Sequence, residues 1–302
     1  MDNMLQPPYL KKNDLVTIIA PAGKIASSLV ANGARLLQQW GLRVKMGKYV
    51  GEEYLGFAGT DEQRCADLQA AVNDPESAAV LCARGGYGCG RIVDNVDFSA
   101  WLENPKWFIG YSDVTVFHAR LQQLGLQSIH GTMPKNFPQN SSNESTESLR
   151  KALFGELLGY DIPAHPFNKP GLAKGVLRGG NLSLIINVSA TPDDVDTTGA
   201  ILFLEDVNEY LYSIDRMMNN LQRSGKLKRT AGVIVGDFKD SKSDEELPGK
   251  TAYEVIAGYL QPLDIPVCYG FPAGHDEPNY SLYFGRELSL EVTGAGVKIN
   301  YL

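Results

Sequence analysis

Ser112 is the residue of this 302-residue chain whose sequence surroundings most favour covalent catalysis. The apolar residues 107–109 predict the end of a buried strand, and apolar positions from Val116 to Leu124 recur at the three- and four-residue spacing of a helix. A serine at such a turn carries its hydroxyl above the edge of the sheet, beside the unbonded N–H groups of a helix N-terminus. This position is typical of a nucleophile, provided that a base and an acid lie near it.

The turn at Ser112 differs at one position from the G-x-S-x-G pattern of a nucleophile elbow. Gly110 stands where the first glycine is expected, but Val114 replaces the second. The alternative interpretation is that Ser112 or Asp113 only caps the following helix, because serine and aspartate are both favoured capping residues.

Four histidines are candidates for the base. His118 follows Ser112 by six residues on the predicted helix and therefore points away from it, so we expect a packed side chain. His165 lies in Pro-Ala-His-Pro, a sequence typical of a surface linker. His130 follows a strand end, whereas His275 lies in a loop rich in glycine and proline after an apolar strand. Because loops of that kind often carry function, His275 is the first candidate and His130 the second.

Two acids at the end of a predicted strand are candidates to orient such a histidine. Glu205 and Asp206 directly follow the apolar residues 201–204, where a carboxylate is partly desolvated. A neutral histidine base needs a group of this kind to hold its tautomer and to stabilise the imidazolium. The alternative is that these acids cap the next element, and the spacing does not choose between Glu205 and Asp206.

Backbone N–H groups near Ser112 can stabilise the negative charge that develops on a carbonyl oxygen during acyl transfer. The N–H of Asp113 is one candidate donor. The glycine-rich loop from Arg84 to Gly88 can supply another, since glycine lets the backbone approach a ligand closely. This loop matches neither G-x-x-x-x-G-K-[ST] nor G-x-G-x-x-G, so the sequence gives little support for a phosphate-binding loop.

The composition argues against several classes of protein. The net charge of −7 is unlike that of a nucleic-acid-binding protein, which carries a basic face. The four cysteines have no C-x-x-C spacing, and H-E-x-x-H is absent, so metal chemistry is disfavoured and we expect free thiols in a reducing compartment. No stretch resembles a secretory signal or approaches the roughly 18 apolar residues of a membrane span. We therefore expect a cytoplasmic protein that binds neither nucleic acid nor membrane.

The order of the predicted elements indicates an α/β protein with two domains. In the first half, strands alternate with helices, which is typical of a parallel sheet that binds ligands at the carboxyl ends of its strands. Thr60 and Gln63 predict a capping box. We expect strands at 15–20, 42–46, 78–83, 107–109 and 127–130, and helices at 27–40, 61–73 and after Ser112.

A polar segment that begins near residue 135 marks the boundary between the domains. We expect an N-terminal domain over residues 1–138, a linker over 139–165 with a helix near 147–154, and a C-terminal domain over 166–302. In the C-terminal domain, strand-like segments are 175–177, 199–204, 231–235, 267–269 and 288–299, and the long helices are 213–224 and 252–260.

The chain resembles the LD-carboxypeptidases, a family of serine peptidases that includes muramoyl-tetrapeptide carboxypeptidases and microcin C self-immunity proteins. The resemblance runs almost from end to end and rests on many motifs in the same order. These motifs are Ile19–Gly23, Phe57–Arg64, Ala83–Gly88, Ile109–Asp113, His130–Gly131, Gly179–Leu182, Leu204–Asp206 and Gly274–His275.

The resemblance implies a catalytic triad of Ser112, Glu205 and His275, and thereby favours Glu205 over Asp206. With this triad, our hypothesis is an acyl-enzyme mechanism in which the backbone N–H groups of Asp113 and Gly86 form the oxyanion hole. It also implies a flavodoxin-like N-terminal domain and a smaller C-terminal α/β domain with the active site between them. Family members are commonly homodimers and act without a metal or cofactor.

The substrate that the resemblance implies is murein tetrapeptide, a small peptide of the cell wall. The enzyme would remove the terminal D-alanine by cleaving the L,D bond after diaminopimelate, during cell-wall recycling. The alternatives are a hydrolase of a peptidyl- or aminoacyl-nucleotide toxin, as in the immunity branch, and a non-enzymatic α/β binding module. A carboxypeptidase must bind a free carboxylate, and Arg84 is the candidate, although a surface or interdomain ion pair is an equal alternative for this arginine.

Overall fold

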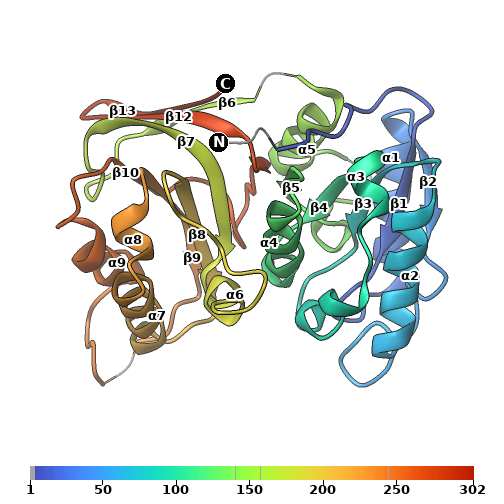
Figure 1. Ribbon diagram of the computed structural model, residues 1–302, viewed down its shortest axis with the longest axis horizontal. Coiled ribbons are helices and arrows are strands. Elements are labelled where there is room, and N and C mark those ends of the chain that lie inside the picture. Colours follow the sequence, from blue (N-terminus) through green and yellow to red (C-terminus); the bar gives the residue numbers. More distant parts are fainter. Residues whose placement is uncertain (1–3, 140, 157, 244) are drawn as a thin grey trace. The chain divides into compact units, whose positions relative to one another are not determined.

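The computed structural model describes residues 4–139, 141–156, 158–243 and 245–302 (Figure 1). The chain divides into two compact units. The first unit comprises Met1–Leu157 and Tyr280–Phe284, and the second comprises Leu158–Asn279 and Gly285–Leu302. A short segment from the last part of the chain thus belongs to the first unit.

The segment expected to be a linker, 139–165, is not a separate region. Its first part contains helix α5 (Glu144–Phe154), which belongs to the first unit because it buries Leu149 and Leu153. The polar residues that suggested a linker include the cap of this helix, where Asn143 accepts from the N–H of Thr146 at 3.0 Å. The last part forms strand β6 (Gly159–Pro163) of the second unit, and residues 140 and 157 lie outside the described residues.

The first unit contains a sheet with strand order β11-β5-β4-β3-β1-β2. All neighbouring pairs are parallel except β11 with β5, which is antiparallel. The order β2-β1-β3-β4-β5 is that of flavodoxin-like folds, as expected from the alternation of strands and helices. The strands are β1 (Leu15–Ile19), β2 (Arg43–Met46), β3 (Ser77–Cys82), β4 (Trp107–Gly110), β5 (Ser128–His130) and β11 (Leu282–Phe284).

The helices of the first unit include the predicted helix at 61–73, whose bounds and capping box are both confirmed. Thr60 Oγ1 accepts from the N–H of Gln63 at 3.3 Å, and Gln63 Oε1 accepts from the N–H of Thr60 at 2.8 Å. The other α-helices are α1 (Ser27–Gln39), α3 (Ala100–Glu103) and α4 (Thr115–Gln123), with α2 the capped helix (Asp61–Asn73). Short 3₁₀ turns are η1 (Cys89–Arg91), η2 (Val93–Asn95), η3 (Ser112–Val114) and η4 (Pro134–Asn136).

The second unit is built on a mixed sheet with strand order β10-β9-β8-β7-β12-β13-β6. The pairs from β10 to β7 are parallel, and those from β7 to β6 are antiparallel. Residues 288–299, expected as one strand-like segment, form a hairpin of two strands that turns at Gly294 and Ala295. The strands are β7 (Gly171–Asn181), β8 (Ile201–Val207), β9 (Gly232–Lys239), β10 (Val267–Tyr269), β12 (Glu287–Thr293) and β13 (Gly296–Tyr301).

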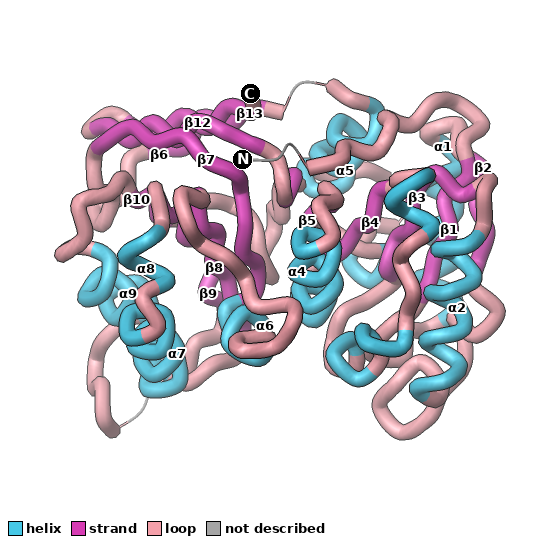
Figure 2. Tube along the Cα trace, in the orientation of Figure 1, coloured by secondary structure: helices cyan, strands magenta, loops and turns pink. Residues whose placement is uncertain are grey.

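The helices of the second unit lie beside the parallel half of its sheet, near β8, β9 and β10 (Figure 2). The two long helices predicted near 213–224 and 252–260 are confirmed, with small differences in their bounds. The helices are α6 (Leu182–Asn187), α7 (Leu211–Arg223), α8 (Lys226–Arg229) and α9 (Ala252–Leu260). Among the described residues, no helix combines the length and apolar character needed to cross a membrane.

At the start of the turn after β4, the side chain of Val114 leaves no space for a side chain at position 110. A Cβ atom at Gly110 would lie 2.9 Å from both γ-carbons of Val114, which is fully buried. Val114 therefore fills the space that a smaller residue leaves open in a G-x-S-x-G elbow, and the absence of a side chain at Gly110 makes this possible.

We expect Gly110→Ala to destabilise the protein by about 1–3 kcal/mol, because the added methyl group overpacks the turn. Val114→Ala should also be destabilising, through lost burial, but should relieve part of the cost of Gly110→Ala in the double variant. Urea unfolding of the four proteins measures this coupling. Strictly additive effects would show that the two side chains do not compete for the same space.

Candidate active site

Ser112 lies at the turn between β4 and α4, as the sequence predicts, and its backbone is strained there. Its φ angle is 65°, a left-handed conformation that is uncommon for a residue other than glycine. The first turn after the strand is the 3₁₀ turn η3, and α4 begins only at Thr115. Strained backbone at a strand-to-helix turn is a feature of nucleophile elbows, and a helix cap does not require it.

The glycine-rich loop after β3 lies directly against Ser112. A Cβ atom at Gly85 would be 3.0 Å from Ser112 Cβ and 3.2 Å from Ser112 Oγ. The carbonyl of Gly85 also accepts a hydrogen bond of 3.1 Å from the N–H of Gly23, in the loop after β1. Glycine at position 85 is therefore what lets this loop approach the serine hydroxyl.

Two N–H groups near Ser112 are suited to bind an oxyanion. The N–H of Val114 donates to the carbonyl of Tyr111 at 3.3 Å, but the N–H of Asp113 donates to no backbone carbonyl among the described residues. It is therefore available to another acceptor. Gly86 is exposed, has a φ of 112°, and donates its N–H to none of the described residues. Both predicted donors are thus in the first unit, one directly after the serine and the other in the glycine-rich loop.

The Asp113 side chain has a structural partner. It is buried, and Oδ2 accepts a 2.8 Å hydrogen bond from the N–H of Cys89, at the start of η1. Burial raises the pKa of the Asp113 carboxyl, and the Cys89 N–H counteracts part of this shift. The aspartate after the nucleophile therefore ties the glycine-rich loop to the serine turn.

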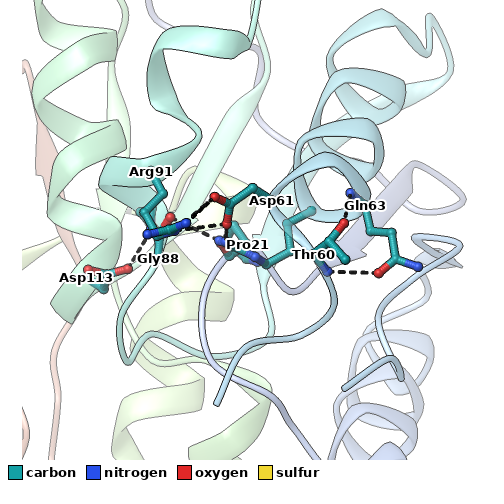
Figure 3. A network of polar contacts seen from close by, with 9 residues as sticks. Pro21, Thr60, Asp61, Gln63, Gly88, Arg91 and Asp113 are labelled. Atoms are coloured by element: carbon teal, nitrogen blue, oxygen red, sulfur yellow. Dashed lines mark hydrogen bonds and ion pairs between the residues drawn. The ribbon is translucent and has the colours of Figure 1, made fainter. Parts of the chain in front are cut away.

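A buried arginine joins the same loop to the end of β1. Arg64 Nη1 donates to the carbonyl of Pro21 at 2.6 Å and to that of Gly88 at 3.0 Å, and the side chain is ion-paired with Asp61. Asp61 also binds Arg91, with three N···O distances between 2.6 and 3.0 Å. Figure 3 shows Asp61 and Arg91 pointing toward each other, beside Gly88. Arg64 thus ties the loop after β1 to the loop after β3.

Arg84 lies beside the loops that approach Ser112. Its Nη1 donates to the carbonyl of Lys24 at 2.6 Å, and its Nε is buried without a hydrogen bond to any described residue. Among the described residues of the first unit, no carboxylate forms an ion pair with Arg84. Burial, and then the positive charge of Arg84, lower the pKa of Lys135. The two cations create a local excess of positive charge.

In the second unit, the structure brings Glu205 and His275 together. His275 Nδ1 lies 2.7 Å from Glu205 Oε2. Glu205 is fully buried, and the His275 side chain keeps 16% of its surface exposed. With Nδ1–H donated to the carboxylate, Nε2 is the nitrogen that can take up a proton.

Asp206, the neighbouring candidate, is occupied elsewhere. Its Oδ1 accepts from Asn181 Nδ2 at 2.9 Å, and its Oδ2 accepts from the N–H and the hydroxyl of Ser183 at 2.9 and 2.8 Å. Burial raises its pKa to about 6, and the negative charge of Glu205 adds to the rise. Because successive residues of a strand point to opposite faces, only Glu205 faces the histidine, and Asp206 binds the first turn of α6 through Ser183.

Two of the other histidines, His118 and His130, are packed in the interior of the first unit. His118 is fully buried, as expected, with Nδ1 2.8 Å from Ser128 Oγ and Nε2 2.9 Å from the carbonyl of Gly110. His130 is also fully buried, with ring centroids 5.7 Å from Tyr111 and 5.6 Å from Phe284.

His165, expected at the surface, is half-buried and stacks on Tyr269 at 5.8 Å. The described residues contain no group of three or more His, Cys, Asp and Glu side chains that is arranged to hold a metal ion.

Both units match known protein domains. Residues 16–131 match the LD-carboxypeptidase N-terminal domain, and residues 174–290 match the LD-carboxypeptidase C-terminal domain. The chain belongs to the LD-carboxypeptidase family. The resemblance inferred from the motifs is therefore confirmed, and membership of this family makes the protein a hydrolase.

The similar proteins of this family include a murein peptide carboxypeptidase and a microcin self-immunity protein. The chain is 37% identical over 290 residues to the probable murein peptide carboxypeptidase of Bacillus subtilis, covering 94% of this chain and 91% of the relative. It is 24% identical over 318 residues to the microcin C7 self-immunity protein of Escherichia coli, covering 93% and 90%.

The fold is shared with a solved member of the family. The crystal structure of muramoyltetrapeptide carboxypeptidase from Oxalobacter formigenes matches with a TM-score of 0.87 and 28% identity, covering 95% of this chain and 98% of that chain. This likeness confirms the predicted α/β fold with two domains.

The sequence alone missed one residue beside the candidate groups of each unit, Arg64 in the first and Asp237 in the second. Arg64 lies within a motif that carries the family resemblance, but nothing in its spacing shows that it reaches Pro21 and Gly88. Asp237 comes two residues after the predicted strand 231–235, much as Glu205 directly follows 201–204, and this position near a strand end is the signal that could have found it.

The burial of His118 predicts how stability depends on pH. Burial lowers the pKa of His118 to about 4, against about 6.5 in an unfolded chain. The neutral imidazole therefore contributes stability above pH 6.5, and this contribution of up to roughly 3 kcal/mol is lost as the pH falls from 6.5 toward 4.

We expect His118→Gln to be less stable than the wild type at pH 7.5, with a difference that narrows at pH 5. Chemical unfolding at both pH values measures it. The Asp206 and Asp237 carboxyls titrate in both proteins, so their contributions cancel in the comparison. A difference in the free energy of unfolding between the two proteins that is the same at pH 7.5 and pH 5 would contradict the lowered pKa of His118.

Proposed function

We propose that the protein is a serine LD-carboxypeptidase that removes the terminal D-alanine from murein tetrapeptide during cell-wall recycling. The observation that carries the proposal is the 2.7 Å hydrogen bond between His275 and the buried Glu205 in a member of this family. A histidine held by a buried carboxylate, with part of its ring exposed, is the usual arrangement of a general base. The strained turn that presents Ser112 supports the same chemistry.

The proposed reaction proceeds through an acyl-enzyme. Ser112 Oγ attacks the carbonyl carbon of diaminopimelate while His275 Nε2 takes up the hydroxyl proton. The L,D peptide bond then breaks, and the proton passes from His275 to the amine of the departing D-alanine. Water attacks the ester with His275 again as base, which releases the shortened peptide. The mechanism requires Ser112 Oγ and His275 Nε2 to meet during the reaction.

The negative charge of the tetrahedral intermediate is assigned to the N–H groups of Asp113 and Gly86. Asp113 directly follows Ser112, and Gly86 directly follows Gly85, which lies against Ser112. Neither N–H has a backbone acceptor among the described residues. Removal of one such donor in other enzymes lowers kcat by about 10²–10³-fold. Loop positions fixed by Asp113 and Arg64 would keep these donors oriented before substrate binds.

Arg84 is proposed to bind the free carboxylate of the terminal D-alanine. Its guanidinium has no carboxylate partner among the described residues of the first unit, and Lys135 adds positive charge beside it. A planar guanidinium can bind a carboxylate through two parallel hydrogen bonds. This contact would explain a preference for the end of a peptide chain over an internal bond.

A toxin-cleaving activity of the immunity type is the second candidate. It would use the same serine, acid and base but a nucleotide-containing leaving group. The higher identity to the murein peptide carboxypeptidase, 37% against 24% for the immunity protein, favours the murein peptide. We further propose that the enzyme acts in the cytoplasm as a homodimer, without a metal or cofactor.

We expect Ser112→Ala to lower D-alanine release from murein tetrapeptide by several orders of magnitude, because the acyl-enzyme cannot form. Amino-acid analysis of the products measures this, with Ser28→Ala, an exposed serine of α1, as the matched control. Peptides with a D,D bond and an aminoacyl sulfamoyl adenylate test the substrate class. Activity of Ser112→Ala within tenfold of the wild type would refute the assignment.

Arg84→Met should raise KM for murein tetrapeptide by about 10–100-fold, the effect of losing a charge-assisted contact. The same variant should have little effect on a substrate whose terminal carboxylate is amidated. Arg43→Met, in an exposed ion pair with Glu76 on β2, is the control. Equal effects of Arg84→Met on both substrates would show that Arg84 does not bind the carboxylate.

A further inference from the structure

We propose that Asp237 is a positioning residue that holds the loop of His275 in place and supplies a second negative charge beside its imidazole. The proposal rests on the proposed function, because it takes His275 as the general base. The contacts that support it all lie within the second unit.

The loop that carries His275 lies along β9 and is hydrogen-bonded to it. The N–H of Phe271 donates to the carbonyl of Val235 at 3.1 Å, and the N–H of Asp237 donates to the carbonyl of Ala273 at 3.0 Å. A Cβ atom at Gly236 would lie only 2.4 Å from the carbonyl oxygen of Ala273. The glycine before Asp237 is thus required for this close approach.

The side chain of Asp237 secures the other side of His275. Its Oδ2 accepts a 3.3 Å hydrogen bond from the N–H of Asp276. Asp237 therefore contacts both neighbours of the segment Gly274–His275: the carbonyl before it through its own N–H, and the N–H after it through its carboxylate. A Cβ atom at Gly274 would be 3.0 Å from Asp237 Cβ and 3.1 Å from Glu205 Oε2, so these three residues are closely packed.

An irregularity in the sheet places Asp237 next to Glu205. Leu204 of β8 is paired with Val235 of β9, whereas Asp206 is paired with Phe238, so β9 contains one additional residue at this point. An extra residue of this kind changes the direction in which the side chains of a strand point. The bulge therefore brings a second strand-end carboxylate to the loop of His275.

The charges around Asp237 are mostly negative. Burial raises its pKa to about 6, and the charges of Asp276 and Glu205 add to the rise, whereas the Asp276 N–H and the charge of His275 oppose it. Asp237 and His275 thus stabilise each other's charged forms. An ionised Asp237 favours the imidazolium that forms when His275 accepts a proton.

Two further groups face this region. Lys239, two residues along β9, forms an ion pair of 3.0 Å with Asp276 and compensates part of the negative charge of that carboxylate. The Tyr253 hydroxyl donates to the carbonyl of Gly236 at 2.9 Å, and burial raises its pKa to about 12, so it stays neutral.

The hydrogen bonds alone do not require an acid at position 237. An asparagine would accept from the N–H of Asp276 equally well, and would avoid the repulsion between Asp237 and the fully buried Glu205. A second carboxylate in this place destabilises the resting enzyme and is useful only where a positive charge appears beside it. That charge is the imidazolium of His275.

The test is the titration of His275 in Asp237→Asn, followed through the histidine C2 protons by NMR. Only four histidines are present, and His275→Gln identifies the resonance. We expect the pKa of His275 to fall by at least about half a unit in Asp237→Asn, since one negative charge is lost while the loop keeps its hydrogen bond. Asp240→Asn, an exposed acid just beyond β9, is the matched control and should leave the pKa unchanged.

Kinetics give a second readout that a purely structural role would not produce. In Asp237→Asn the acid limb of the pH profile of kcat/KM should move to lower pH together with the NMR value. We expect kcat to fall roughly tenfold, a part of what general-base catalysis contributes, with KM within twofold of the wild type. Asp237→Ala, which also removes the acceptor for Asp276, should lose more activity.

A His275 that titrates at the same pH in the wild type and in Asp237→Asn would overturn the proposal. If Asp237→Asn does not fold, as judged by circular dichroism, Asp237→Ser carries the same expectation, because it is neutral and keeps an acceptor. The NMR titration needs no substrate. It therefore tests Asp237 even if the wild type releases no D-alanine, a result that would count against the proposed function alone.

Discussion

The hydrogen bond between His275 and the buried Glu205 is the interaction on which the arrangement of the second unit depends. A carboxylate without exposed surface is costly unless a partner compensates its charge, and Glu205 Oε1 has no hydrogen bond to any described residue. The contact with His275 is thus the main compensation available within the described residues. It is possible only because Gly274 has no side chain where Glu205 and Asp237 approach the loop.

In the first unit, several contacts hold Ser112 in a strained backbone conformation. Backbone strain persists only where the surrounding contacts determine it. Gly85 lies against the serine side chain, Asp113 binds the N–H of Cys89, and His118 donates to the carbonyl of Gly110. These contacts come from loops and helices on both sides of β4. Together they set the direction of the hydroxyl and of the nearby N–H groups.

The sequence predicted most of the elements that carry these groups. The largely apolar runs 15–19 and 201–204 are buried strands, as predicted, and the capping box at Thr60 starts its helix at the predicted residue. The segment expected as a linker, 139–165, contains α5, close to the helix expected near 147–154, and its polar residues include the cap of that helix. The hairpin at 288–299 was missed because its turn is too short to interrupt the apolar pattern.

The sequence by itself determined the chemical types of the candidate groups and their positions at strand ends. It could not determine which of them meet. Glu205 and Asp206 are adjacent, and the tertiary structure decided between them, because neighbouring strand residues face opposite ways and only one side holds His275. Asp237 enters the same cluster through a bulge between β8 and β9. Such contacts depend on packing between segments about 30 to 70 residues apart, which no local pattern records.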